Sequence, residues 1–414
     1  MIPMTSWTGV MRLGALLFLA GCGEELPVES VEPAESAEPV SELDRLRALG
    51  YAGLSSETVG EGLSGVLVFD QARSQPGYNL YSVRLLCRVV LMNAVGQEVR
   101  RWERPQDRAW SHAQLVDNGD LLVIGQEHSR PYLGAVDEHR YLLRLSWNGE
   151  ELWKVDLNAH HDLEVAPGGE ICVLSFARTL GSELTEEGVE LREDELLLLN
   201  SEGERIGRRS LVTALSGGVY EWGAVRPNES GGVRYLDLIH ANSLEFLQRA
   251  ELFGRGDMYA EGCVLVTARH QDCVLVMDWE SGELIWSWGH GELLGPHGAS
   301  WLASGNLLIF DNGLSRGWSR VIELDPRTEQ IVWEYKSDFP EDFYSPSRGS
   351  CQRLANGNTL VAASTSGRAF EITPGGEIVW SWINPAREEG GQVATVVRMT
   401  RLDLDFVDRL RGGR

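Results

Sequence analysis

The chain has 414 residues, of which 43% are hydrophobic, and a formal net charge of −24 at pH 7. An acidic balance of this size argues against nucleic acid and against a bare anionic membrane surface as partners, because both would repel the chain. The basic side chains are nearly all arginine, with Lys154 and Lys336 as the two lysines. A planar guanidinium suits planar oxyanions better than an ammonium group does.

The N-terminal segment predicts a bacterial lipoprotein signal. A short apolar run follows Met11-Arg12 and ends in Leu19-Ala20-Gly21-Cys22. The run is too short to span a bilayer and ends in small residues, unlike a transmembrane helix. We expect residues 1–21 to be removed and Cys22 to carry the lipid, which anchors the chain in the outer membrane facing the periplasm or the cell surface. The alternative is an ordinary secretory signal followed by an unmodified Cys22.

The rest of the chain divides into a tether and one large domain. Residues 22–62 are rich in Glu, Pro and Ser, which is typical of a solvated tether. Residues 63–414 have uniform apolar content and turn spacing, and repeat-built domains reach this size as one unit. The acidic stretch from Glu183 to Glu195 is interpreted as a solvated loop. Five cysteines besides Cys22 lack metal-type spacing, so we expect buried free thiols.

Two signals repeat along the domain. A histidine followed by a glycine turn and an apolar strand occurs at His112, His161 and His297. Tryptophans recur after Gly-Glu turns or their relatives, at Trp102, Trp153, Trp286, Trp333 and Trp380. Periods of about 40 to 50 residues with several short strands are typical of β-propeller blades. The sequence therefore predicts an all-β fold, a six-bladed β-propeller.

This fold explains where the histidines should lie. The innermost strand of each blade lines a central channel, so a side chain repeated at one position per blade forms a ring. His240 belongs to the set if a long insertion separates it from its turn. His160 and His161 should point to opposite faces of a strand, and we take His161 as the inward one. The tryptophans are predicted to pack between blades.

The segment from His297 to Glu323 resembles the bacterial arylsulfate sulfotransferase family, whose members are periplasmic six-bladed propellers. The matching motifs extend over most of the chain, and they are Pro76 to Tyr81, His160-His161-Asp162, His240-Ala241-Asn242-Ser243, Phe310-Asp311-Asn312-Gly313, Ser319-Arg320-Val321 and Leu354 to Leu360. The resemblance implies transfer of a sulfuryl group from a phenolic sulfate to a phenol through a sulfated histidine, without the nucleotide donor PAPS. It implies small-molecule aryl sulfates and phenols as partners.

The resemblance also implies site residues. His240 and His297 would bind or protonate the sulfate and the leaving oxygen, and Arg316 would hold the sulfuryl oxygens. Cationic and N–H donors aimed at these oxygens stabilise the charge that spreads over them in the transition state. Further candidate substrate-binding residues along the channel are His161, His112, Asn242, Arg320 and Arg348. We expect no cofactor and no metal ion, because the chain has neither a nucleotide-binding loop nor a zinc-binding helix motif.

One feature departs from the family pattern. No histidine follows His297, and the slot of the family's nucleophile falls at Gly349-Ser350. Either another histidine attacks the sulfur, or the chain keeps the fold and an anion-binding funnel with a changed activity. The alternative function is therefore a non-catalytic envelope propeller that binds an anionic ligand or scaffolds a partner. A quinone-dependent dehydrogenase propeller is a third hypothesis, supported only by the Gly-to-Trp repeat.

Overall fold

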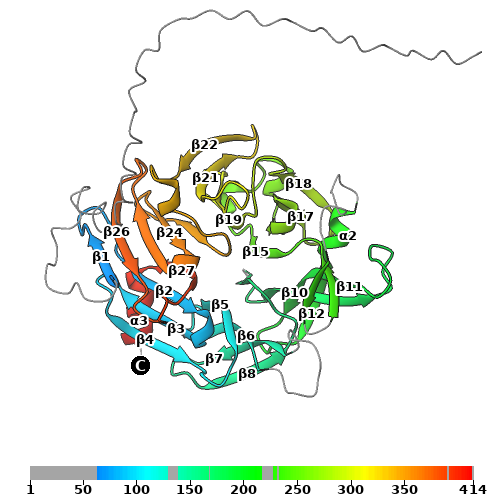
Figure 1. Cartoon of the computed structure of the whole chain (residues 1–414), viewed down its shortest axis with the longest axis horizontal. Coiled ribbons are helices and arrows are strands. Elements are labelled where there is room, and N and C mark those ends of the chain that lie inside the picture. Colours follow the sequence, from blue (N-terminus) through cyan, green and yellow to red (C-terminus); the bar gives the residue numbers. More distant parts are fainter. Residues whose placement is uncertain are drawn as a thin grey trace, which may run out of the picture.

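Six sheets, antiparallel apart from one parallel strand pair, stand in a ring around a central axis in the computed structural model (Figure 1), which confirms the predicted six-bladed propeller. The structure describes residues 63–128, 139–166, 168–216, 227–230, 233–388 and 391–412. The predicted signal peptide, Cys22 and the tether lie outside these residues. None of the helices in the described part of the chain has the length and hydropathy that a membrane span requires.

Blades 1 to 3 follow one another along the chain, with the innermost strand given first for each. Blade 1 contains β27 (Val396–Leu402), β2 (Tyr78–Val83), β3 (Arg88–Asn93) and β4 (Glu98–Glu103). Blade 2 contains β5 (Ala109–Leu115), β6 (Leu121–Gln126), β7 (Arg140–Leu145) and β8 (Glu151–Asp156). Blade 3 contains β9 (Leu163–Val165), β10 (Ile171–Leu180), β11 (Glu190–Leu199), β12 (Arg205–Ser210), β13 (Asn228–Ser230) and β14 (Val233–Asp237).

Blades 4 to 6 complete the ring. Blade 4 contains β15 (Ala241–Phe246), β16 (Cys263–Ala268), β17 (Cys273–Asp278) and β18 (Leu284–Trp288). Blade 5 contains β19 (His297–Trp301), β20 (Leu307–Asp311), β21 (Arg320–Asp325) and β22 (Gln330–Tyr335). Blade 6 contains β23 (Ser350–Arg353), β24 (Thr359–Ala363), β25 (Arg368–Ile372), β26 (Ile378–Ile383) and β1 (Gly65–Phe69). The helices are α2 (Leu211–Leu215) and α3 (Leu404–Gly412).

The two ends of the described domain close the ring. The C-terminal strand β27 pairs with β2 as the innermost strand of blade 1, and the N-terminal strand β1 pairs with β26 as the outermost strand of blade 6. The helix α3 follows β27 and packs on blade 1, where the Tyr78 hydroxyl donates to Asp408 over 2.7 Å. Each terminal strand thus joins a blade built from the other end of the domain.

Burial differs between the middle and the edge of each blade. All six residues of β6 and of β16 are buried, which fits strands covered by blades on both faces. The edge strand β22 alternates between exposed and half-buried residues. The five cysteines of the described chain are buried and free, as the sequence predicts.

The repeated tryptophans lie on the outermost or next-to-outermost strands and connect neighbouring blades. The indole N–H donates to a turn carbonyl of the next blade from Trp102 to Trp147, Trp153 to Ser201, Trp333 to Pro374 and Trp380 to Ala94. The fifth, Trp286, has a buried indole nitrogen without a hydrogen-bond partner among the described residues. Packing between blades, which the sequence predicts, is therefore accompanied by a repeated hydrogen bond.

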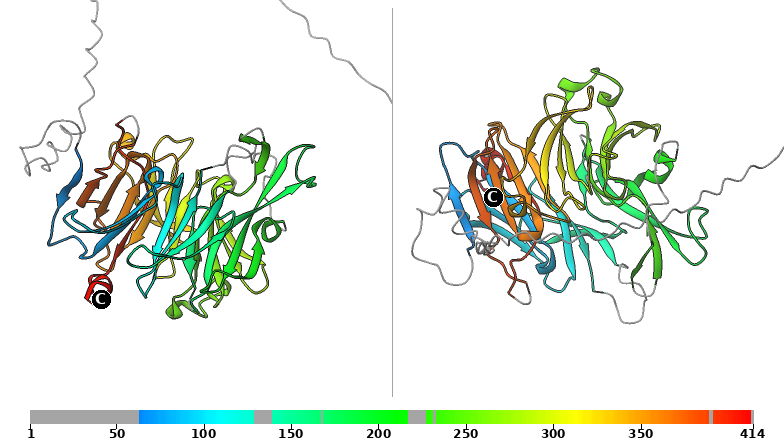
Figure 2. Two further views of the ribbon diagram at one scale, coloured as in Figure 1. Left: turned by 90° about the horizontal axis from the view of Figure 1, so that it is seen from below. Right: turned by 45° about the horizontal axis from the view of Figure 1, so that its top comes forward.

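The acidic stretch from Glu183 to Glu195 is only partly a loop, so this prediction was wrong for its second half. Residues from Glu190 onward form β11, which pairs with β10 over ten residues and extends past the neighbouring blades (Figures 1 and 2). Glu190, Asp194 and Glu195 are buried there. Their charges are compensated by neighbours, such as Arg178, whose Nε lies 2.7 Å from Glu190. Tertiary pairing explains why a run of acids lies inside the protein.

We predict that Trp380→Phe lowers the melting temperature of the domain. Trp380 is fully buried, and its N–H donates over 2.8 Å to Ala94 across the seam between blades 6 and 1. Loss of this bond and of buried ring surface should cost about 2 kcal/mol. Differential scanning calorimetry measures the shift. Trp333→Phe is the control, because the ring of Trp333 is only half-buried. Equal shifts in both variants would contradict a special role of the seam.

Candidate functional site

The histidines that the sequence singles out lie in two layers of the channel. His240 and His297 stand where the innermost strands β15 and β19 begin, and His161 lies just before β9. These three rings form one layer, since His240 and His297 both act on the pKa of His161. His112 lies within β5, deeper in the channel, where its Nε2 is 3.3 Å from Asp162. The predicted ring therefore has three histidines, with His112 displaced from it.

His160 and His161 do not point to opposite faces of a strand, so this prediction was wrong. Both residues precede β9, and His161 adopts a left-handed backbone conformation with φ of 55°. The turn brings their Nδ1 atoms to 2.8 Å from each other. His161 also contacts the ring of His240, with centroids 4.7 Å apart. Two adjacent histidines thus share one cluster.

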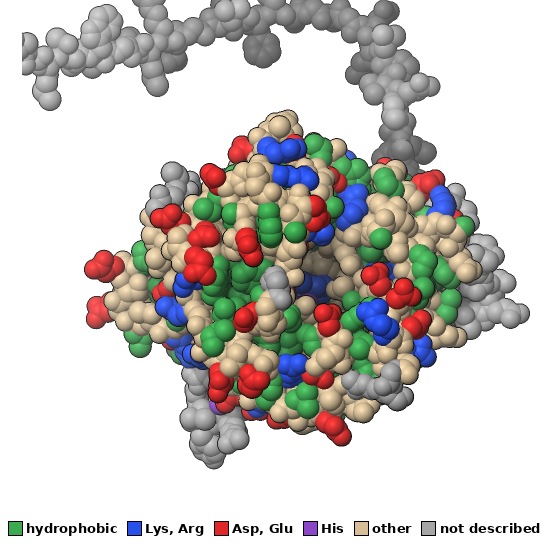
Figure 3. All heavy atoms as spheres, turned by 180° about the vertical axis from the view of Figure 1, so that it is seen from behind, with side chains coloured by type: hydrophobic (Ala, Val, Ile, Leu, Met, Phe, Trp, Pro, Cys, Tyr) green, Lys and Arg blue, Asp and Glu red, His purple; other side chains and the backbone are tan. Residues whose placement is uncertain are grey.

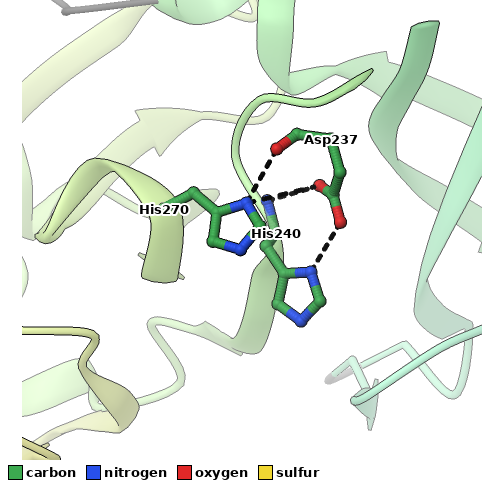
Figure 4. A group of neighbouring side chains, drawn as sticks. All are labelled: Asp237, His240 and His270. Carbon is green, nitrogen blue, oxygen red and sulfur yellow. Dashed lines mark hydrogen bonds and ion pairs between the residues drawn. The ribbon is translucent and has the colours of Figure 1, made fainter. Parts of the chain in front are cut away.

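His240 is held by a carboxylate three residues before it (Figure 4). Its Nδ1 lies 2.6 Å from Asp237 Oδ2, and its backbone N–H donates to Asp237 Oδ1 over 3.0 Å. His270, at the end of blade 4's second strand, stacks on His240 with ring centroids 4.6 Å apart. Its Nδ1 donates to the backbone carbonyl of Asp237 over 2.7 Å. The sequence analysis did not include Asp237 or His270.

The hydrogen-bond partners assign the ring protons of the cluster. The Asp237 carboxylate accepts a hydrogen bond from Nδ1 of His240, and the Asp237 backbone carbonyl accepts one from Nδ1 of His270. In the neutral form of each ring, Nε2 then carries the lone pair. His160 Nε2 lies 3.2 Å from the Asp194 carboxylate without forming a hydrogen bond among the described residues, and the nearness of that carboxylate favours a proton on this nitrogen. His160 Nδ1 then accepts from His161 Nδ1. His161 therefore also keeps a free Nε2.

Burial and neighbouring charges shift the pKa values of two histidines and one carboxylate of the cluster. Burial, reinforced by neighbouring His240, holds the pKa of His161 well below its usual value. Burial and the same neighbour also lower the pKa of His270. Burial by itself raises the pKa of Asp237, but the charge and hydrogen bond of His240 outweigh it and hold that pKa low. His161 and His270 are therefore predominantly uncharged at neutral pH.

His297 is fully engaged. Its Nδ1 lies 2.7 Å from Asn312 Oδ1 and 3.1 Å from the Gly295 carbonyl, and its Nε2 accepts from the backbone N–H of Arg348 over 3.2 Å. Burial is the main cause that lowers its pKa to about 3. With both nitrogens used and the ring neutral, His297 has no free atom for attack or proton donation in this arrangement.

The contacts of His297 shape the loop before blade 6. Asn312 Nδ2 donates to the carbonyls of Ser345 and Arg348, each over 2.6 Å. Arg348 itself has a left-handed backbone with φ of 58°, and Gly349 follows with φ of 115°. His297 and Asn312 bind the backbone N–H and the carbonyl of Arg348, so together they fix the position of its Cα atom, from which the side chain extends.

The two arginines after the Phe310-to-Gly313 turn are committed to ion pairs. Arg316 Nη2 lies 3.0 Å from Asp311, and its guanidinium covers the ring of Trp318. Arg320 contacts Asp311, Glu292 and Glu334 at 2.8, 2.7 and 3.0 Å. Although burial opposes it, these carboxylates raise the pKa of Arg320. Both side chains stabilise the turn.

Two other arginines at the same end of the channel have no such partners. The guanidinium groups of Arg84, after β2, and Arg348 make no hydrogen bond or ion pair with the described residues, and both side chains are half-buried. The same holds for Arg269, which follows β16. Burial, followed by the positive charges of Arg348, Arg140 and Arg108, lowers the pKa of Arg84 to about 10. Unpaired, partly desolvated cations are costly, so an anion bound between them would be stabilised.

Histidine and arginine side chains both line the channel mouth. The histidines come from the starts of blades 3, 4 and 5, Arg348 and Arg84 come from blades 6 and 1, and Arg269 lies beside His270 in blade 4, where it acts on the pKa of His297. Asn242, on β15 beside His240, donates to the Pro296 carbonyl over 2.8 Å. Its buried Oδ1 has no partner among the described residues and is available as an acceptor. Imidazole rings and guanidinium groups are therefore both available at the channel mouth.

A cavity of about 850 Å³ opens at the other end of the channel, where the innermost strands finish. It is lined by His112, Asp162, Glu164, Glu245, Trp301 and Arg398 among others. Arg398 makes two bonds of 3.0 Å to Asp162. Burial raises the pKa of Glu245 to about 7 and holds that of Glu164 well above its usual value. The side of the ring opposite to the view of Figure 1 is hollowed at its centre, with basic side chains deep inside (Figure 3).

The fold and the channel define a six-bladed propeller with an imidazole-rich channel mouth. The chain belongs to the arylsulfotransferase (ASST) family, whose model matches residues 112–385. This range includes the histidines of the cluster, Asp237 and the loop of Arg348. The resemblance found in the sequence is confirmed. No curated protein matches the chain.

Solved structures share the fold at low sequence identity. A protein of unknown function from Bacteroides caccae is 14% identical over 78% of this chain and 98% of its own, with a TM-score of 0.50. A streptogramin B lyase is 11% identical over 82% and 93% of the two chains, with a TM-score of 0.45. The β-propeller domain of Cps50 (Swd1) from Myceliophteria thermophila is 13% identical over 83% and 98%, with a TM-score of 0.45.

We predict that His297 makes the domain less stable in acid. Its folded pKa of about 3 lies below the value of about 6.5 expected for an unfolded histidine. Its contribution is therefore complete above pH 6.5 and is lost as the pH falls toward 3, with a loss of about 2 kcal/mol by pH 5. Melting temperatures of the wild type, His297→Asn and the exposed-site control His290→Asn, measured from pH 8 to 5, test this. Parallel curves for all three proteins would contradict it.

Proposed function

We propose that the protein transfers a sulfuryl group from a phenolic sulfate ester to a phenol, with His240 as the nucleophile. Membership of the arylsulfotransferase family supports the reaction class. The observation that carries the assignment is the pairing of His240 Nδ1 with Asp237 at 2.6 Å, which leaves Nε2 free in a mouth that also contains unpaired arginines. A histidine oriented by a carboxylate is the arrangement that activates imidazole in nucleophilic and general-base sites.

In the first half-reaction, the Nε2 lone pair of His240 forms a bond to sulfur while the bond from sulfur to the phenolic oxygen breaks. The phenolate leaves with the electron pair, and His240 becomes a sulfated imidazolium that still carries its Nδ1 proton. Asp237 stabilises the positive ring through that proton. This role requires Asp237 to stay ionised, and its lowered pKa supports that.

In the second half-reaction, the oxygen of an acceptor phenol attacks the sulfur and the nitrogen–sulfur bond breaks. The free Nε2 of His161, whose ring touches that of His240, takes the phenolic proton. The proton then passes to the phenolate released in the first step. The cycle returns His240 to its starting state and converts one aryl sulfate and one phenol into another such pair.

Two arginines at the channel mouth would hold the sulfuryl oxygens. Arg348 and Arg84 are proposed for this role because their guanidinium groups form no ion pair with the described residues, whereas Arg316 and Arg320 are bound to Asp311. Donors fixed toward the three oxygens stabilise their charge in the transition state. In this proposal His297 positions Arg348 through the N–H bond of 3.2 Å. The missing late histidine is replaced by His240, from another blade.

A non-catalytic binding propeller is the second candidate. It is favoured by the glycine and serine that occupy the family's nucleophile slot at Gly349-Ser350. The same unpaired arginines would then retain an anionic ligand without turnover. Isothermal titration with a poorly reactive aryl sulfonate detects such binding, and retention of binding without any sulfuryl transfer would favour this candidate.

We further propose that a lipid on Cys22 holds the protein at the cell envelope. The variant Cys22→Ser tests this proposal. In cells fed a radiolabelled fatty acid, the wild type should carry the label and the variant should not. Label on both chains would overturn this proposal.

We predict that the purified chain releases 4-nitrophenol from 4-nitrophenyl sulfate only when a phenol acceptor is present. His240→Ala should abolish release, and Asp237→Asn should lower kcat by about 10² to 10⁴-fold because the ring loses its orienting charge. Arg348→Ala should lower kcat/KM by about 10² to 10³-fold. Stopped assays of nitrophenol absorbance measure these rates.

The controls separate loss of chemistry from loss of folding. Arg205→Ala changes an exposed arginine of β12 and should leave the rate unchanged. Melting curves verify that each variant is folded. Mass spectrometry of peptides from a quenched reaction should find His240 heavier by about 80 Da, because SO3H replaces a hydrogen atom. Full activity of His240→Ala would refute its assignment as the nucleophile.

A further inference from the structure

The structure assigns a divalent transition-metal site to Asp237, His240 and His270, which the sequence analysis did not include. Each residue offers one ligand atom, and these atoms lie within 4.8 Å of one another. Two imidazole nitrogens and a carboxylate oxygen form a donor set that suits Zn²⁺ and its neighbours among the divalent metals. His270 has no role in the proposed sulfuryl transfer, so its placement against His240 and Asp237 needs another explanation.

The backbone around the three residues is already arranged for a common ligand. The turn from Asp237 to His240 and the turn that carries His270 are joined by a bond of 2.9 Å from the His270 N–H to the Ile239 carbonyl. Gln271 Nε2 adds a bond of 2.6 Å to the Leu238 carbonyl. The ion would therefore bind without the cost of ordering two separate loops, because both are fixed to each other.

Metal binding would switch off the proposed reaction, and this consequence rests on the proposed function. A neutral imidazole has one proton and one lone pair. If the ion binds Nε2 of His240 it occupies the lone pair directly, and if it binds Nδ1 the proton moves to Nε2. In either case His240 cannot attack sulfur. Zn²⁺ should therefore inhibit sulfuryl transfer, because each enzyme molecule that holds the ion at His240 is inactive. An excess of aryl sulfate should restore the rate only where it displaces the ion from His240.

The test measures binding separately from turnover. Zn²⁺ is titrated into the purified chain in competition with a fluorescent chelator, and one site with a dissociation constant in the micromolar range or tighter is expected. His270→Ala and Asp237→Asn should each weaken binding at least about tenfold. His290→Ala, which removes an exposed histidine, should bind as the wild type does. His270→Gln is a second variant that keeps the side-chain volume close to that of histidine.

Co²⁺ in place of Zn²⁺ identifies the ligands. Its visible bands should indicate nitrogen and oxygen donors and should disappear in His270→Ala and His270→Gln. Thiolate charge-transfer bands, unchanged affinity in the folded His270 variants, or the absence of Zn²⁺ binding would each overturn the site. If Zn²⁺ binds through His270 but no aryl sulfate turns over, the proposed function fails and the metal site stands. If turnover occurs and Zn²⁺ neither binds nor inhibits, the metal site fails alone.

Discussion

The architecture depends on how the backbone N–H groups of the innermost strands are satisfied. Each of these strands is the edge of its blade, and its outward amides have no strand partner in the channel wall. Side chains of the preceding blade supply acceptors instead. Asp162 accepts from the Leu244 N–H at 3.0 Å, Glu245 from the Trp301 N–H at 2.8 Å, and Gln352 from the Arg401 N–H at 2.7 Å.

This constraint explains much of the polar lining of the channel. Glu245 is buried with a pKa raised to about 7, yet its carboxyl group binds a backbone amide of the next blade. Asp194 likewise accepts from the Ala241 N–H at 2.6 Å, immediately beside His240. Buried carboxylates in the channel are therefore primarily connections between blades. Chemistry is left to the groups that these connections do not use, which are the free Nε2 atoms and the unpaired guanidinium groups.

The most specific sequence motif of the chain serves as a scaffold. In the turn from Phe310 to Gly313, Asp311 accepts hydrogen bonds from Arg316 and Arg320. Asn312 bonds to His297 and to the carbonyl of Arg348. These bonds fix the backbone of a loop that carries the unpaired side chain of Arg348. A motif can thus be specific for a family because it positions a residue elsewhere. The same view explains why Asp237, which holds one ring of the cluster, matters as much as the histidine that it orients.

The sequence by itself determined the periodic features of this protein. Turn glycines and tryptophans repeat once per blade because every blade must bury the same faces against its neighbours, so the six-bladed ring and the family could be predicted. His240 and Arg348 were also singled out in the sequence, and their roles stay predictions. Only the tertiary structure decided which of these side chains remain free. His297, Arg316 and Arg320 carry the right chemistry in sequence, but their partners come from other strands and occupy them. Arg84 and His270 have no sequence signal at all, because their neighbours at the channel mouth come from different turns of the ring.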